Sequence, residues 1–234
     1  MHYMKMIPSE RSVSAEREIK AYGVLHNDSI PRLFCVRRYS GGTCLWLTYF
    51  PGETLGEMVR RGRRFSVDEV INVGIQLCDV LDCMHSNRPE RVFHLDLHPD
   101  NLVICNGRLR IIDFGNSWCG TGRCVVGKLS GTPRFSAPEL RRGGEIDQTA
   151  DIFSAGKILM YMMDFVENGR SRAEAIRKLG NAAAACVREE PAYRIRQAGD
   201  LGDILREIKG NFDLGEHAGS PAGIRRMRMP EERL

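Results

Sequence analysis

HLDLHPDN at residues 94–101 and DFG at residues 113–115 are the two segments that indicate most about the fold of this chain. They contain three oxygen-bearing side chains at a characteristic spacing: Asp96, Asn101 and Asp113. A single Asp or Asn in a loop is commonly a turn residue or a helix cap. Carboxylate and amide oxygens are also the ligands that a hard cation such as Mg²⁺ prefers. Three such side chains, with a gap of hairpin length between Asn101 and Asp113, therefore indicate a common cation-binding site rather than three separate turns.

The composition is typical of a globular protein. The chain has 234 residues, of which 42% are hydrophobic and 27% are charged, and its formal net charge is only +4. This modest charge does not indicate a nucleic-acid partner. The longest apolar stretch, residues 152–163, contains Lys157 and is too short to span a membrane. The N-terminus lacks the pattern of a signal peptide, so we expect a cytoplasmic protein.

The first 52 residues are predicted to form short strands and one helix. Apolar residues at helical spacing predict a helix over residues 12–25. A strand is expected at residues 1–7, before this helix, and two more at residues 33–39 and 44–50. The turn-forming pair Pro51-Gly52 ends the last strand.

The remainder is predicted to be mainly helical. Ser66 and Glu69 have the spacing of a capping box, which begins a buried helix that runs to His85. Asn106-Gly107 indicates a tight hairpin between short strands. The strands of this hairpin are expected at residues 102–105 and 109–112, a long loop at 113–139, and further helices near 147–163, 171–188 and 198–209.

The order His-x-Asp-Leu-x-x-x-Asn followed by Asp-Phe-Gly resembles the catalytic and metal-binding loops of the protein kinase superfamily, in particular those of bacterial-type Ser/Thr protein kinases. Further segments resemble family motifs in the same order: Gly131–Glu139, Asp151–Gly156 and Glu190–Arg194. The resemblance implies an α+β, bilobal protein kinase-like fold with a truncated small β lobe and a mainly helical large lobe. The implied divisions are a partial N-lobe at 1–52, a helical C-lobe with the catalytic and activation loops at 53–209, and a flexible tail at 210–234.

The resemblance also implies catalytic roles. Asp96 would accept or orient the proton of a substrate hydroxyl. Lys5 would pair with the phosphates of ATP, and Glu18 would hold Lys5 in an ion pair. His98 stands where the family usually has a lysine that touches the transferring phosphoryl group, and it can still donate a hydrogen bond.

ATP and Mg²⁺ are the implied cofactors, with Asn101 and Asp113 as the metal ligands. Leu47 would be the gatekeeper of the nucleotide pocket, and backbone groups of Thr48 and Phe50 would meet the adenine. A protein substrate would lie on a platform that brings Thr132 near Asp96. Structural roles are implied for His94, Phe114, Glu139, Asp151 and Arg194, with Asp151 bracing the catalytic loop and Arg194 pairing with Glu139.

Two departures from the family pattern concern the nucleotide pocket. The chain begins at the strand that carries Lys5, so we expect the two preceding strands and their Gly-x-Gly-x-x-Gly turn to be absent, which would weaken nucleotide binding. A start codon assigned too far downstream would explain the same observation. Tyr3 stands where the family usually has a small alanine over the adenine, and a tyrosine there could crowd the pocket.

Two further departures lie inside residues 94–101. Leu95 replaces an arginine that commonly pairs with a phosphate on the activation loop, and a leucine cannot form that pair. We therefore expect that phosphorylation is not the main on-switch at any of three candidate positions: Thr121, Ser130 and Thr132. His98, in the sequence Asp-Leu-His-Pro, also occurs in small-molecule kinases related to aminoglycoside and choline kinases.

Three interpretations remain open at this point. The complete set of Asp96, Asn101 and Asp113 favours a Ser/Thr protein kinase-like phosphotransferase that moves the γ-phosphate of ATP to a protein hydroxyl. The missing Gly-rich turn favours a pseudokinase or a truncated kinase-like binding module. His98 favours a small-molecule kinase.

Overall fold

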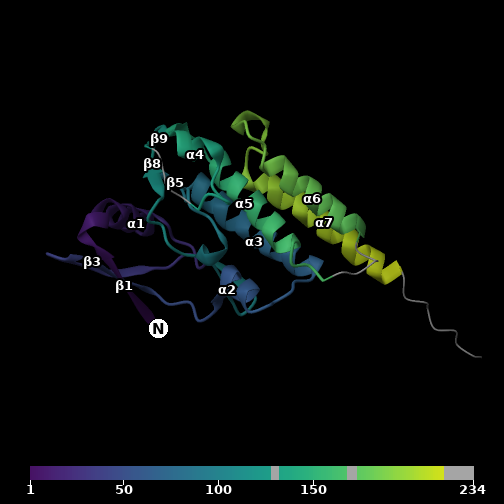
Figure 1. Ribbon diagram of the computed structural model, residues 1–234, viewed down its shortest axis with the longest axis horizontal. Helices are drawn as coiled ribbons and strands as arrows, with labels where there is room; N and C mark the ends of the chain where they lie inside the picture. Colours follow the sequence, from purple (N-terminus) through teal and green to yellow (C-terminus); the bar gives the residue numbers. More distant parts are fainter. Residues whose placement is uncertain (128–131, 168–172, 219–234) are drawn as a thin grey trace, which may run out of the picture.

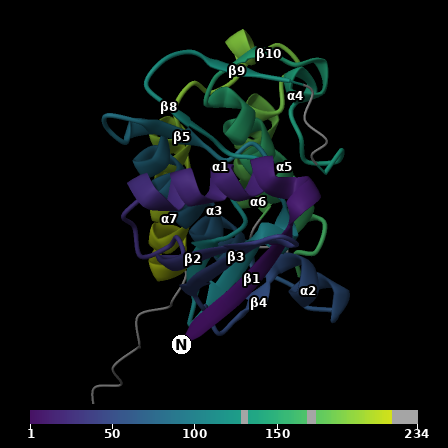
Figure 2. The same cartoon turned by 90° about the vertical axis from the view of Figure 1, so that its left-hand side faces the viewer.

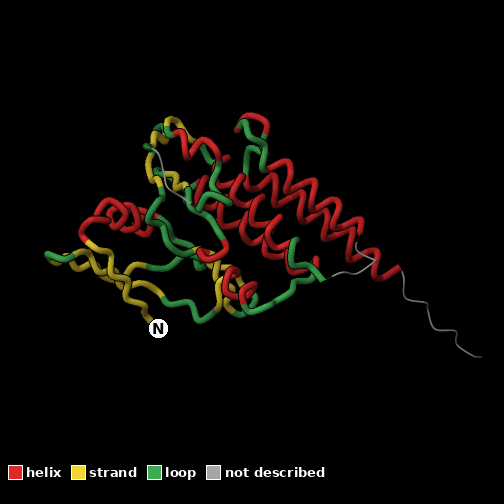
Figure 3. Tube along the Cα trace, in the orientation of Figure 1, coloured by secondary structure: helices red, strands yellow, loops and turns green. Residues whose placement is uncertain are grey.

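The hydrophobic patterns of the sequence produce two lobes of different composition (Figure 1). The computed structural model describes residues 1–127, 132–167 and 173–218. Strands gather in the smaller lobe and around the junction, whereas long helices make up most of the larger lobe (Figure 3). The predicted α+β, bilobal fold class is confirmed.

The small lobe is a three-stranded antiparallel sheet with one helix. The strand order is β1-β3-β2, formed by β1 (His2–Pro8), β3 (Gly42–Thr48) and β2 (Leu33–Tyr39). A short 3₁₀ turn leads from β1 into α1 (Ser12–Val24). This helix lies between the sheet and the large lobe (Figure 2). Side chains alternate along a strand, so Tyr3 and Lys5 point to the same face of β1. The strands and the helix predicted for this region are confirmed.

The helix α3 (Val67–Ser86) forms the centre of the large lobe. Its predicted capping box is present: the Ser66 hydroxyl accepts the N–H of Glu69 at 3.1 Å, and the Glu69 carboxylate accepts the N–H of Ser66 at 2.8 Å. A side chain at Gly74 would clash with Leu159 and Leu205, so this glycine allows two neighbouring helices to approach closely.

Three other long helices complete the bundle around α3 (Figure 1). They are α5 (Thr149–Met163), α6 (Ala173–Cys186) and α7 (Ala198–Ala218). Within the three described ranges of the chain, none of the helices combines the length and the apolar character needed to cross a bilayer.

A small sheet at the junction carries the predicted hairpin. Its strands are β4 (Glu53–Thr54), β6 (Leu102–Cys105) and β7 (Arg108–Ile111), in the order β4-β6-β7. Asn106 and Gly107 join β6 to β7 with positive φ angles of 50° and 72°, which is the conformation that a tight type I′ turn requires. This hairpin places the end of residues 94–101 beside the start of residues 113–115.

The predicted long loop at 113–139 contains short elements that the sequence pattern does not indicate. Here β8 (Trp118–Gly120) pairs with β5 (Arg91–Phe93), and β9 (Cys124–Val126) pairs with β10 (Gly144–Ile146). The short helices α2 (Leu55–Arg60) and α4 (Pro138–Arg142) were also missed. Elements of three to six residues are too short to show a hydrophobic period.

The last helix is longer than predicted. The sequence predicts an end at residue 209, whereas α7 continues to Ala218, so the first residues of the predicted flexible tail are helical. The rest of that tail, residues 219–234, and the candidate phosphorylation position Ser130 lie outside the described residues.

The capping box of α3 should stabilise the protein measurably. Ser66→Ala removes the acceptor for the N–H of Glu69, and we expect the free energy of unfolding, measured by urea denaturation, to fall by about 1 kcal/mol. Ser86→Ala is the control at the other end of the same helix, where the hydroxyl only donates to the carbonyl of Asp82 at 2.7 Å. We expect this control to change stability by less than about 0.5 kcal/mol, and equal losses in the two variants would contradict the prediction.

Candidate active site

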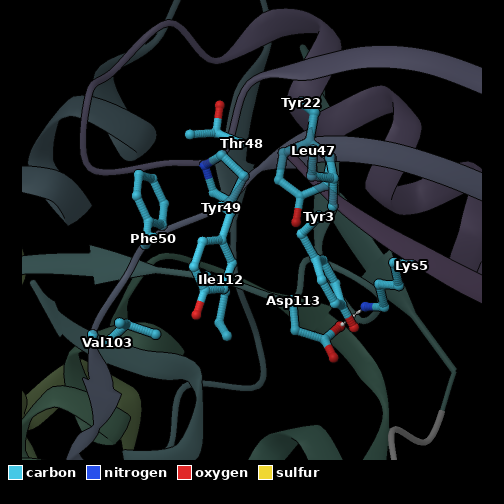
Figure 4. A pocket seen from close by; sticks show the side chains of 12 residues that line it. Tyr3, Lys5, Tyr22, Leu47, Thr48, Tyr49, Phe50, Val103, Ile112 and Asp113 are labelled. Carbon is cyan, nitrogen blue, oxygen red and sulfur yellow. Dashed lines mark ion pairs between the residues drawn. The ribbon is translucent and has the colours of Figure 1, made fainter. Parts of the chain in front are cut away.

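A cavity of about 270 Å³ opens at the junction of the two lobes (Figure 4). Leu47 and Tyr3 line it from the small sheet, and Val103 and Ile112 line it from the β6–β7 hairpin side. The segment from Thr48 to Phe50, which links the lobes, forms one edge. Lys5 and Asp113 meet at the other end, so the cavity has apolar walls and a charged end (Figure 4).

Lys5 lies between two carboxylates at this charged end. Its Nζ is 2.7 Å from Glu18 Oε1 and 3.0 Å from Asp113 Oδ1. Burial opposes the positive charge, but these two carboxylates raise the pKa of Lys5. Lys5 in turn lowers the pKa of Asp113 against the effect of burial. The structure thus brings together the Lys–Glu pair and the first residue of the Asp-Phe-Gly segment.

Glu18 ties the helix α1 to the Asp-Phe-Gly segment. Its side chain is fully buried, and Oε1 accepts both Lys5 Nζ and, at 3.1 Å, the backbone N–H of Phe114. Burial raises the pKa of Glu18, and the nearby ammonium of Lys5 offsets only part of this effect. One carboxylate oxygen therefore holds two groups that belong to different lobes.

The side chain of Asp151, on α5, holds the start of the loop at 94–101 by hydrogen bonds. This carboxylate is fully buried; its oxygens accept the backbone N–H groups of His94 and Leu95, each at 2.8 Å. His85 Nε2 lies 2.9 Å from Oδ2 and must donate, because an ionised carboxylate only accepts. Burial opposes ionisation, but the hydrogen bond from His85 and the neighbouring groups lower the pKa of Asp151. Leu95 has a φ of 63°, an uncommon value for a residue with a side chain, so these bonds hold a strained turn.

Asp96 belongs to the loop that Asp151 holds, and it accepts hydrogen bonds from Asn101, Asn116 and Thr132. Its backbone carbonyl accepts Asn101 Nδ2 at 2.9 Å. Its carboxylate accepts the backbone N–H of Thr132 at 3.3 Å and the side-chain amide of Asn116 at 3.0 Å. The N–H of Ile112 donates to the carbonyl of Asn101 at 3.0 Å, which sets Asn101 beside Asp113. Asn116 was not identified from the sequence, because an Asn after Gly115 is typical of an ordinary turn.

Phe114 and His94 form part of a buried aromatic column. The ring of Phe114 lies 5.2 Å from that of Tyr22 on α1 and 4.7 Å from that of His94, between ring centroids. His94 Nε2 is 3.2 Å from the carbonyl oxygen of Ile112, to which it must donate. Complete burial lowers the pKa of His94.

The predicted pair of Glu139 and Arg194 is present, although the two residues are 55 positions apart. Arg194 makes two parallel bonds to this carboxylate, at 2.6 and 2.8 Å. Its guanidinium also donates to the carbonyls of Arg188, Glu189 and Thr149. This pair therefore anchors α4, which follows the segment containing Thr132, to the chain beyond α6.

His98 and Leu95 differ in how the structure uses them. In the described residues, the side chain of His98 makes no hydrogen bond to Asp96; it lies near Asp100, whose pKa is lowered first by Arg60 and also by His98. Leu95 is buried in an apolar cluster instead of presenting a charge. The other buried members of this cluster are Phe93, Cys124, Ala137, Leu140, Ile146, Ala150 and Phe153. Leu95 therefore serves the packing of this cluster and presents no charged group.

Comparisons with known proteins agree with this geometry. Residues 2–190 match a family model described as "Protein kinase domain". The chain is 34% identical over 151 residues to CBL-interacting serine/threonine-protein kinase 8 of Arabidopsis thaliana, covering 63% of this chain and 33% of that protein. It is 27% identical over 222 residues to serine/threonine-protein kinase pkn3 of Myxococcus xanthus, covering 88% and 40% of the two chains. For serine/threonine-protein kinase PknK of Mycobacterium bovis the identity is 24% over 212 residues, covering 79% and 19%. The chain therefore spans 19% to 40% of the length of these relatives.

Breaking the Glu139–Arg194 pair should be costly. Arg194→Leu leaves a carboxylate that is only 13% exposed without its partner, and we expect the free energy of unfolding to fall by about 3–5 kcal/mol in urea denaturation. The double variant Glu139→Leu with Arg194→Leu should recover part of this loss, because it removes both charges. Arg177→Leu, which breaks an exposed pair with Glu174, is the control and should cost less than about 1 kcal/mol. A loss as small in Arg194→Leu as in this control would contradict the prediction.

Stability should also depend on pH through His94. Because its pKa is lowered by burial, the folded protein keeps this imidazole neutral, whereas the unfolded chain takes up a proton near pH 6.5. The stability that comes from keeping His94 neutral is fully present above about pH 6.5. As the pH falls below this value, the free energy of unfolding decreases by at most about 1.4 kcal/mol per pH unit. Urea denaturation between about pH 5 and 7.5 should show a smaller slope for His94→Phe than for the wild type. His26→Phe, at an exposed position, should leave the slope unchanged. Identical slopes for the wild type and His94→Phe would contradict the assignment.

Proposed function

This chain belongs to the protein kinase family, and from that membership we propose that it is a serine/threonine protein kinase that uses ATP and Mg²⁺. The observation that carries the proposal is Lys5 Nζ held 2.7 Å from Glu18 and 3.0 Å from Asp113, at the charged end of a cavity that has apolar walls. The names of the similar proteins, all of them serine/threonine-protein kinases, support the same class of acceptor. In this proposal residues 1–52 form the N-lobe and residues 53–209 the C-lobe.

The cavity fits a nucleotide. A flat base suits the apolar space between Leu47, Val103 and Ile112, and the backbone of the segment Thr48–Phe50 offers hydrogen-bonding groups at its edge. Lys5 at the opposite end would pair with the anionic phosphates. Tyr3 lines the same cavity and remains 51% exposed, so its proposed effect is to limit the room above the base.

Asp113 and Asn101 are the proposed ligands for Mg²⁺. The lowered pKa of Asp113 keeps its carboxylate ionised at neutral pH. The described residues contain no cluster of three or more His, Cys, Asp or Glu side chains that could hold a metal. Proteins commonly bind Mg²⁺ through one or two carboxylates together with substrate phosphates, and Asp113 and Asn101 would supply one carboxylate and one amide oxygen. When bound, the ion would neutralise part of the phosphate charge.

Asp96 is the proposed acceptor of the proton from the substrate hydroxyl. In the transfer, the hydroxyl oxygen forms a bond to the γ-phosphorus while the bond from that phosphorus to the bridging oxygen breaks, and ADP leaves. Such a reaction depends mainly on positioning and on charge, with little covalent participation by the protein. The hydrogen bonds that the backbone N–H groups of His94 and Leu95 donate to Asp151 support this role, because they restrict the backbone that carries Asp96. Thr132, whose N–H reaches Asp96, would belong to the platform for a protein substrate.

The proposal predicts that nucleotide binding and transfer can be separated. Mg-ATP should raise the melting temperature of the chain, and Asp113→Asn should remove most of the Mg²⁺-dependent part of that shift, because it weakens the metal site. Asp96→Asn should spare much of the shift and lower phosphate transfer by at least about 100-fold. Transfer is measured with radiolabelled ATP and a degenerate library of Ser/Thr peptides.

Asp79→Asn is the matched control, because Asp79 pairs with Arg206 on the outer side of the helical bundle. It should change neither the nucleotide-dependent shift nor the transfer. A wild-type chain that binds Mg-ATP without transferring phosphate would favour a binding module over an enzyme. A wild-type chain that shows no shift at millimolar Mg-ATP would contradict the proposal altogether.

A further inference from the structure

The carboxylate of Asp96 receives hydrogen bonds from the chain on both of its oxygens. Oδ2 accepts the side-chain amide of Asn116 at 3.0 Å, and Oδ1 accepts the backbone N–H of Thr132 at the longer distance of 3.3 Å. A carboxylate has no proton to donate, so it is the NH₂ group of Asn116 that faces Oδ2. Oδ1 accepts the longer of the two bonds, and an ionised carboxylate oxygen has a second lone-pair site for a further donor.

A short strand ladder holds the two bonded residues close together. Phe93 in β5 pairs with Trp118 in β8, and their rings stack at 5.1 Å between centroids. Asp96 follows Phe93 by three residues, and Asn116 precedes Trp118 by two. The ladder therefore fixes the start of one loop against the end of the other.

A turn on the other side of Asn116 completes this restraint. The N–H of Gly115 donates to Asp113 Oδ1 at 3.2 Å, and the N–H of Ser117 donates to the carbonyl of Phe114 at 3.0 Å. Asp113 is itself held by Lys5. Asn116 thus lies between Asp113, which Lys5 holds, and Trp118, which pairs with Phe93. These restraints keep its amide close to Asp96.

In the described residues, the side chain that donates to the carboxylate of Asp96 is that of Asn116, and the side chain of His98 makes no hydrogen bond to it. The amide of Asn116 is a neutral donor of fixed geometry. It can orient the carboxylate of Asp96 without adding a charge beside the reacting groups.

We infer that Asn116 is a positioning residue of the phosphoacceptor site. Its amide holds Oδ2 of Asp96 so that Oδ1 faces the incoming hydroxyl. This inference rests on the proposed function, because it assigns the orientation of the group that receives the hydroxyl proton. It also links the segment after Asp113 to Asp96, so that the metal-binding and proton-accepting loops are set in one arrangement.

The test compares two substitutions of Asn116 with a matched control. Asn116→Leu keeps a similar volume and removes the donor, whereas Asn116→Gln keeps an amide on a longer side chain. Asn72→Leu is the control, because Asn72 makes the same type of bond, from its amide to the carboxylate of Asp68 at 2.7 Å, on α3 and away from the cavity. The rate constant of transfer and the KM for ATP are measured with the degenerate Ser/Thr peptide library.

We expect Asn116→Leu to lower the rate constant by about 10- to 100-fold, as a small misplacement of a reacting group does, and to leave the KM for ATP within about twofold. Asn116→Gln should recover part of the rate, and Asn72→Leu should leave the rate unchanged. A rate that is unchanged or higher in Asn116→Leu overturns the inference. A rise in the KM for ATP that accounts for the loss also overturns it, because Asn116 would then serve the nucleotide.

A second measurement does not depend on activity. The changes in the free energy of unfolding, measured by urea denaturation, should not be additive for Asp96→Ala, Asn116→Leu and the double variant, because each substitution removes the same hydrogen bond. Additive shifts overturn the inference. If the wild-type chain transfers no phosphate, the proposed function fails, and this cycle alone then decides whether Asn116 holds Asp96.

Discussion

The buried carboxylate of Asp151 is the constraint on which the geometry of the site depends. An ionised carboxylate without partners in the interior costs several kcal/mol, so it is stable only where donors surround it. Here the donors are His85 and two backbone N–H groups of the loop at 94–101. To present both N–H groups inward, the loop adopts a positive φ at Leu95. Asp96 is the next residue, and its carboxylate accepts hydrogen bonds from Asn116 and Thr132.

A second buried carboxylate, that of Glu18, joins the small lobe to this arrangement. One of its oxygens accepts both Lys5 and the backbone N–H of Phe114. The ring of Phe114 is packed between Tyr22 on α1 and His94 on the braced loop. A displacement of α1 would therefore break the ion pair and uncover the aromatic column in the same step. The position of Lys5 depends on the packing of the large lobe for this reason.

The long elements could be predicted from the sequence because each repeats its pattern several times. The helix from Val67 to Ser86 shows both its capping box and its buried face in the order of its residues. The ladder of Phe93 with Trp118 could not be predicted, because each strand has three residues and its stability depends on a partner far along the chain. Asn116 was missed for a related reason: nothing in its local sequence distinguishes a turn residue from one that binds Asp96.

The residues alone established the family resemblance, the order of the chemical groups and the identity of the candidate residues, since Asp96 and Asp113 occur in recognisable local motifs. Tertiary structure decided which groups meet. Lys5 reaches Glu18 across 13 positions, and Asp96 receives Asn116 across 20. Such pairs form because burial removes water from polar groups and leaves them only the partners that packing brings within reach. No periodic pattern in the sequence indicates which distant residues will pair in this way.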